Sequence, residues 1–210
     1  VVEVLPTLKQ AAVQKTLPNR LVDSYEETIK QNPKYPVCAG GALLDDECLK
    51  YVDPELPLIV LIGDSHASQW SDVIAQIART RSYQLLMFPS CMARMQDDLL
   101  LNGTPQCKGM EDRLVTILKM LTPEVVVTSS KLYTPVSIFD SIAEVQYWAK
   151  SQRDFIELLS PHTKSWLVIG DTPELDLHVP DCLSQNKDNI TRCGRTRKQA
   201  TPRLFQAAEK

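Results

Sequence analysis

From residue 58 onward, the chain alternates between continuous apolar runs and apolar stripes with helical spacing. The runs, which are typical of strands buried on both faces, are LIVLIG (58–63), YQLLMF (83–88), EVVVTSS (124–130) and SWLVIGD (165–171). The stripes between them are Trp70, Val73, Ile74, Ile77 and Ala78, then Leu114, Ile117, Leu118 and Leu121, then a long helix over 141–159. This alternation predicts βαβ units with right-handed crossovers. We therefore expect an α/β protein with a three-layer, flavodoxin-like fold and a central parallel sheet.

The two ends of the chain are less regular than its centre. Residues 1–57 show one short helical pattern at VDSYEETIK (22–30), and we expect an N-terminal wrapping or linker segment there. Residues 58–210 form the expected α/β domain. After Asp171 the pattern loosens into a loop that contains two cysteines, and a further helix is predicted from Thr201, followed by Pro202 at the first helical position.

Composition and charge narrow the possible functions. The 210 residues are 43% hydrophobic and 23% charged, which is enough for an ordinary core. The formal net charge is −3, and basic residues cluster only at Arg192, Arg195, Arg197 and Lys198. Since nucleic-acid binding needs a concentrated basic surface, we expect no nucleic-acid partner. No stretch approaches the roughly 20 apolar residues of a membrane helix. Because the chain begins at Val1, we expect it to be a piece excised from a longer protein.

Six cysteines fall into three local couples along the chain. Pairing within each couple predicts the disulfides Cys38–Cys48, Cys91–Cys107 and Cys182–Cys193. The spacings alone do not fix this connectivity. A metal site is the weaker interpretation, because the sequence contains no C-x-x-C motif. Three disulfides indicate an oxidising, extracytoplasmic compartment.

The sequence Gly63-Asp64-Ser65-His66 follows the first predicted strand directly. Ligands of open α/β sheets bind at the carboxyl ends of the strands, and a serine at a helix start there suits nucleophilic catalysis. The simpler alternative is that Asp64 or Ser65 only caps the helix. Side chains of adjacent residues diverge at a turn, so we do not expect Asp64, Ser65 and His66 to form a self-contained triad.

These residues carry a family resemblance. The block LIGDSHASQW after a parallel strand resembles the first block of the SGNH (GDSL-like) hydrolases. More narrowly, Gly-Asp-Ser-His-Ala-x-Gln-Trp is similar to the extracytoplasmic SGNH domain fused to bacterial acyltransferase-3 membrane proteins. Those proteins O-acylate cell-wall glycans and envelope glycolipids. The order of the later blocks agrees, from PSCM after the second strand to the cysteine couples, over about residues 20–205.

The resemblance implies a set of site residues. It makes Ser65 the nucleophile, with Asp64 and His66 in the same catalytic block. It also implies oxyanion donors, and the sequence offers these candidates: Ser65, Ser90, Cys91 and Ser129. Ser90 or Cys91 would replace the family's Gly after the second strand, because Pro89 has no N–H to donate. Ser129, Ser130 or Lys131 would replace the family's Asn after the third strand.

The resemblance also implies partners and a location. It predicts an acyl donor, acetyl in the simplest case, delivered by a membrane acyltransferase-3 domain, and a glycan or glycolipid acceptor. It implies no cofactor, and the absence of G-x-G-x-x-G argues against a nucleotide or flavin. The expected location is the periplasm or cell surface, anchored to the membrane through the parent protein.

The general base is the missing part of the predicted site. The family takes it from a late Asp-x-x-His motif, which these 210 residues lack, and we expect that block beyond Lys210. His178 follows the fourth strand and is a lesser alternative, whereas His162 precedes that strand and is expected in a surface loop. Two other functions therefore stay open: an esterase of the same fold, and a glycan-binding domain without catalytic activity.

Overall fold

The computed structural model describes residues 15, 38, 49–50, 52–89, 91–95, 107–131, 142–170 and 179–194. The chain divides into two compact units, one formed by Val1–Asn32 with Pro173–Glu209 and the other by Pro33–Thr172. The predicted sheet and the Gly63–His66 segment both belong to the second unit. The expected division at residue 57 remains a prediction.

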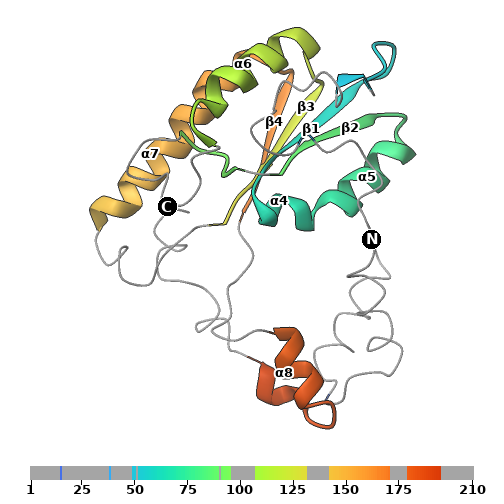
Figure 1. Cartoon of the computed structure of the whole chain (residues 1–210), viewed down its shortest axis with the longest axis vertical. Coiled ribbons are helices and arrows are strands. Elements are labelled where there is room, and N and C mark those ends of the chain that lie inside the picture. Colours follow the sequence, from blue (N-terminus) through green and yellow to red (C-terminus); the bar gives the residue numbers. More distant parts are fainter. Residues whose placement is uncertain are drawn as a thin grey trace. The chain divides into compact units, whose positions relative to one another are not determined.

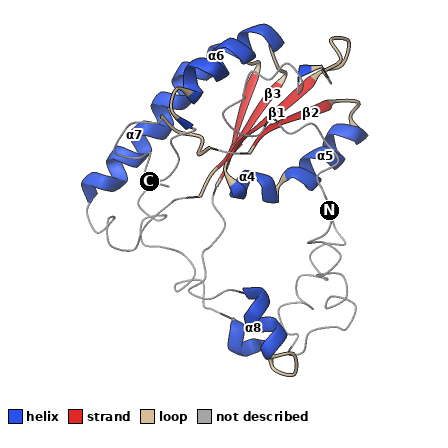
Figure 2. Ribbon diagram, in the orientation of Figure 1, coloured by secondary structure: helices blue, strands red, loops and turns tan. Residues whose placement is uncertain are grey.

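The centre of the second unit is a four-stranded sheet. Its strands are β1 (Leu58–Gly63), β2 (Gln84–Phe88), β3 (Val125–Ser129) and β4 (Ser165–Ile169). They lie in the order β2-β1-β3-β4, and every neighbouring pair is parallel (Figure 2). The predicted α/β fold with a central parallel sheet is thereby confirmed, and the four strands fall within the four predicted runs.

Helices connect these strands. After β1 come α4 (Ser65–Gln69) and α5 (Ser71–Thr80), α6 (Met110–Leu121) precedes β3, and α7 (Ile142–Leu159) runs into a short 3-10 helix, η2 (Ser160–His162), before β4. The first unit contains α8 (Val179–Gln185) and the 3-10 helix η3 (Ile190–Cys193). Among the described helices, none has the length and apolar character needed to cross a bilayer.

The core of the second unit is divided by the sheet, because successive side chains of a strand point to opposite faces. Leu58, Val60 and Ile62 pack into a cluster that includes buried residues of α6 and α7. Ile59 and Leu61 pack into a second cluster with Ala67 of α4 and Ile74, Ala75 and Ala78 of α5. Figure 1 shows these helix pairs on opposite sides of the sheet. The predicted three layers are therefore present in this unit.

The helix after β1 differs from the predicted stripe. The helical path is interrupted at Trp70, which ends α4 and precedes α5. The predicted face included Val73 and Ile77, yet each is 50% exposed, whereas Ala75 is buried. The small side chains of Ala75 and Ala78 belong to the cluster on the sheet, so the buried stripe of α5 lies about one residue further around the helix.

Strand β4 also departs from its prediction. Its apolar run predicted burial on both faces, but Leu167 is 52% exposed and Val168 is exposed as well. End position alone does not explain this, since β2 at the other end of the described sheet is buried. The difference is coverage, because β2 contributes residues to both core clusters, whereas Leu167 and Val168 belong to neither. Near its start, Lys164 Nζ lies 2.6 Å from Glu124 Oε2, and the hydrogen bond to this carboxylate raises the pKa of Lys164.

Two of the predicted disulfides are confirmed. Cys91 is bonded to Cys107, and Cys182 is bonded to Cys193. Cys38 is disulfide-bonded too, but its predicted partner Cys48 lies outside the described residues. The backbone N–H of Cys38 also donates to Met87 O at 2.8 Å, which covers part of the β2 edge of the sheet.

Candidate functional site

The carboxyl ends of β1 and β3 meet where the strand order changes direction. From β1 the chain crosses to β2 on one side and later to β3 on the other side. Gly63 and Ser129, the last residues of β1 and β3, are partners in the parallel register. Open α/β sheets bind their ligands at such a switch point, so the Gly63–His66 segment occupies the expected place.

Gly63 is required by the close approach of β3. A Cβ on this residue would lie 1.8 Å from Ser129 O and 2.7 Å from Ala67 Cβ. Its φ of +154° is also a conformation that side chains rarely adopt. Helix capping alone gives no reason for this glycine. The close approach of β3 explains the glycine, because a residue without a side chain leaves room for the Ser129 carbonyl and for Ala67 of α4.

Asp64 is held by two backbone groups from different elements. It is the N-cap of α4, and its Oδ1 accepts a hydrogen bond from the N–H of His66 at 2.8 Å. Its Oδ2 accepts from the N–H of Lys131, just after β3, at 2.9 Å. The capping interpretation is therefore confirmed for Asp64, but the carboxylate also fixes the start of α4 to the end of β3.

Ser65 is the first residue of α4, and it is exposed. Ala67, two residues further, is fully buried against the sheet, which turns the Ser65 position outward. His66 is half-buried, and neighbouring residues on a helix do not face each other. The expectation that Asp64, Ser65 and His66 do not form a self-contained triad remains a prediction. Their catalytic roles remain predictions.

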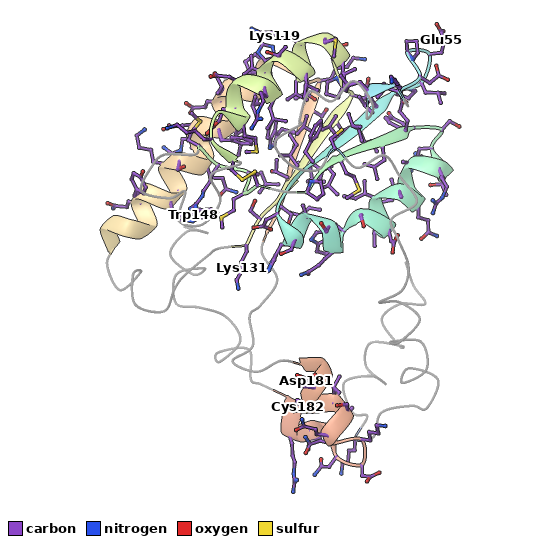
Figure 3. The ribbon with its side chains drawn as sticks, in the orientation of Figure 1. Glu55, Lys119, Lys131, Trp148, Asp181 and Cys182 are labelled. Carbon is purple, nitrogen blue, oxygen red and sulfur yellow. A yellow bond between two sulfur atoms is a disulfide. The ribbon has the colours of Figure 1, made fainter. Side chains whose placement is uncertain are left out.

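The residues at the end of β3 include the predicted oxyanion candidate Ser129 and the serine that follows it. Ser129 is 2% exposed, and in the described part of the chain its Oγ has no hydrogen-bond partner. The hydroxyl of Ser130 accepts a hydrogen bond from the N–H of Ala93 at 2.7 Å. Figure 3 shows Lys131 at this end of the sheet. The contact of Ser130 was not predicted, because its partner is 37 residues away in the chain.

The other predicted residues are placed as follows. Cys91 is buried in the loop after β2 and bonded to Cys107 just before α6, whereas Ser90 lies outside the described residues. His162 is half-buried and ends η2, close to the amino end of β4 and away from the carboxyl edge, rather than lying in an open surface loop. His178 also lies outside the described residues.

Comparison with known proteins gives a consistent result. A family model described as SGNH domain (fused to AT3 domains) matches residues 32–209. No curated protein matches the chain. Among solved structures, the chain is similar to the periplasmic domain of a lipopolysaccharide acetyltransferase from Salmonella ser. Paratyphi A, with 15% identity and a TM-score of 0.53. The similarity covers 84% of this chain and 67% of that one, and at this identity it shows a shared fold.

Proposed function

The chain belongs to the family of SGNH domains fused to AT3 domains, and from that membership we propose that it is an extracytoplasmic O-acyltransferase domain. Membership of this family supports an acyltransferase- or esterase-type function. In our proposal, Ser65 accepts an acyl group, acetyl in the simplest case, from a donor that a membrane AT3 domain delivers. It then transfers this group to a hydroxyl of a cell-envelope glycan or glycolipid.

The observation that carries the proposal is the placement of Ser65. This residue is exposed at the switch point of the sheet, and the segment before it is fixed on both sides. Gly63 is locked against β3, and Asp64 binds backbone groups of both α4 and the end of β3. A nucleophile on such a rigid support is held in a defined position relative to its substrate.

The chemistry takes two steps on one oxygen atom. Ser65 Oγ attacks the acyl carbonyl carbon, loses its proton to a base, and the bond from that carbon to the donor's leaving group breaks as the leaving group takes up a proton. In the second step an acceptor hydroxyl attacks the serine ester, loses its proton, and Ser65 Oγ is released and protonated again. The N–H of Ser65 and a backbone N–H of the loop after β2 stabilise the oxyanion in both steps.

The base is a separate question from the nucleophile. Asp64 suits positioning rather than proton transfer, because each of its carboxylate oxygens already accepts a backbone N–H. The proposed base is the histidine of the family's late Asp-x-x-His block, which these 210 residues do not contain. Two disulfides among the described residues support the extracytoplasmic location, since such bonds persist in oxidising compartments.

The first prediction tests the nucleophile. In the natural full-length protein, Ser65→Ala should lower glycan acylation by about 10³-fold or more, because no other atom can form the acyl intermediate. Mass spectrometry of the envelope glycans from cells that carry each variant measures this loss. Ser68→Ala, on the same helix, is the matched control and should keep wild-type acylation. Unchanged acylation in Ser65→Ala would overturn the proposal.

Two other functions use the same fold. An esterase would pass the acyl group to water, so the partition of an acyl group between water and added glycan distinguishes it from a transferase. A glycan-binding domain without catalytic activity is favoured by the lack of an Asn after β3 and of an Asp-x-x-His motif. That domain would bind glycan equally well with Ser65→Ala.

A further inference from the structure

The hydrogen bonds at the end of β3 point to Ser130 as a positioning residue for the loop that follows β2. This segment, residues 91–95, is called here the β2 loop. The inference deepens the proposed function and rests on it, because it concerns how the two sides of the oxyanion site are held relative to each other. Ser130 itself need not touch the substrate for this role.

The β2 loop is attached to several elements of the second unit. The disulfide between Cys91 and Cys107 ties its start to the segment before α6. The Arg94 guanidinium carbon lies 5.5 Å from the centroid of the Trp148 ring on α7, a distance suited to a cation–π contact. Met95 N–H donates to Ser151 O at 3.2 Å, and Ser151 Oγ donates to Met95 O at 3.0 Å. A loop with so many attachments is preorganised rather than adaptable.

Ser130 ties the middle of this loop to β3. Its Oγ accepts the N–H of Ala93 at 2.7 Å, and both residues are buried, with exposures of 6% and 1%. Water therefore has little access to replace the hydroxyl as the partner of this N–H. Loss of the acceptor would leave a buried donor unsatisfied unless the loop moved.

Ser129 and Lys131, on either side of Ser130, contact the segment that leads into Ser65. The Ser129 carbonyl fills the space that Gly63 leaves free, and the Lys131 N–H binds Asp64, which caps the helix that begins at Ser65. Three consecutive residues thus contact β1, the start of α4 and the β2 loop. The backbone from 130 to 131 therefore adds a direct link between the β2 loop and the residue that caps α4, beside the pairing of β1 with β2.

If Ser130 positions the β2 loop, its loss should affect kcat rather than KM. Oxyanion donors bind the charge that develops in the transition state. A shift of the β2 loop therefore weakens the binding of the transition state more than it weakens the binding of the substrate. Removal of a whole oxyanion donor costs about 10²–10³-fold in kcat. A displaced but still present donor should cost less, so we expect a loss of about 10-fold to 100-fold in kcat with little change in KM.

The experiment uses the natural full-length protein with an acyl donor and purified acceptor glycan. Ser130→Thr and Ser130→Val are nearly equal in shape and differ in the hydroxyl, so their comparison isolates the hydrogen bond from any steric effect. We expect Ser130→Thr to keep more than about a third of the wild-type kcat, and Ser130→Val to show the loss given above. Amide hydrogen exchange at Ala93 should accelerate in Ser130→Val alone.

The matched control is Ser151→Ala. Ser151 has the same exposure of 6% and also binds the β2 loop, but the bond from Met95 N–H to the Ser151 carbonyl survives its substitution. This variant should keep kcat within about threefold of wild type, even where its thermal stability falls as much as that of Ser130→Val.

The outcomes separate this inference from the proposed function. Equal kcat in Ser130→Thr and Ser130→Val, or a rise in KM without a fall in kcat, overturns the positioning role. Global unfolding of Ser130→Val together with normal folding of Ser151→Ala makes Ser130 a purely structural residue and overturns it as well. Ser65→Ala is assayed in parallel, and full activity of that variant rejects the proposed function itself.

Discussion

At the scale of single residues, the carboxylate of Asp64 connects two segments of backbone beside the proposed nucleophile. Both of its oxygens accept backbone N–H groups, one from α4 and one from the residue after β3. A carboxylate suits this arrangement because it is an acceptor on both oxygens. An amide of the same shape would direct an NH₂ group at one of the two N–H donors.

We therefore predict that Asp64→Asn is destabilising despite its small change in size. The lost acceptor and the opposed donors should lower the free energy of unfolding by about 2 kcal/mol. Urea unfolding followed by circular dichroism measures this change. Asp53→Asn is the control, because the Asp53 side chain accepts one N–H, that of Glu55 at 2.9 Å, and an amide oxygen can keep that bond. Equal stability of both variants would contradict the prediction.

The sequence predicts part of this site at residue level and cannot predict the rest. A polar residue between a buried strand and a helix indicates a cap, and the cap at Asp64 is confirmed. The second bond of Asp64 reaches Lys131, 67 residues away, and the Ser130 bond spans 37 residues. Such contacts depend on the order of the strands in the sheet, and local sequence patterns carry no information about that order.

At the scale of elements, continuous apolar runs predicted strand positions better than strand environments. Each of the four runs contains a strand, with ends that differ by at most two residues. The runs of β3 and β4 nevertheless look alike in sequence, although β3 is largely buried and β4 is largely exposed. Burial depends on which other elements cover the faces of each strand, and β2 is buried although it too ends the sheet, so the hydrophobic pattern did not distinguish β3 from β4.

This difference predicts unequal costs for two neighbouring substitutions. Val127 on β3 and Leu167 on β4 are register partners, but Val127 is buried and Leu167 is 52% exposed. Val127→Ala should lower the free energy of unfolding by about 2 kcal/mol, because it opens a cavity in the core. Leu167→Ala removes more carbon atoms but should cost less than about 1 kcal/mol. Thermal unfolding of the two variants tests this order, and a larger loss for Leu167→Ala would refute it.

At the scale of the whole molecule, the sequence predicted the class of fold and the chemistry of the cysteines. The order β2-β1-β3-β4 with parallel pairing is the flavodoxin-like arrangement expected from the alternation of strands and helices. The division into two compact units, one of which joins Val1–Asn32 to Pro173–Glu209, was not predicted. Contacts between segments from opposite ends of the chain, such as Ile190 N–H to Lys15 O at 2.8 Å, leave no local signal.

Each confirmed disulfide closes a loop within a single unit. We predict that Cys91→Ala combined with Cys107→Ala lowers the free energy of unfolding of the sheet-containing unit by about 3 kcal/mol, as expected for a loop of 16 residues. Chemical unfolding monitored by tryptophan fluorescence measures the change. Wild-type protein treated with a thiol reductant should lose at least as much stability, and insensitivity to the reductant would argue against stabilisation by disulfides.

The interlocked ends of β1 and β3 have a consequence for protein engineering. Gly63 leaves space for the Ser129 carbonyl, and Asp64 accepts a hydrogen bond from Lys131, so both residues need the backbone of residues 129–131 beside them. A peptide that copies only Gly63 to His66 into another scaffold would therefore lose its geometry. The smallest transplantable unit comprises two strand termini that are distant in the chain, and a designer has to move both together.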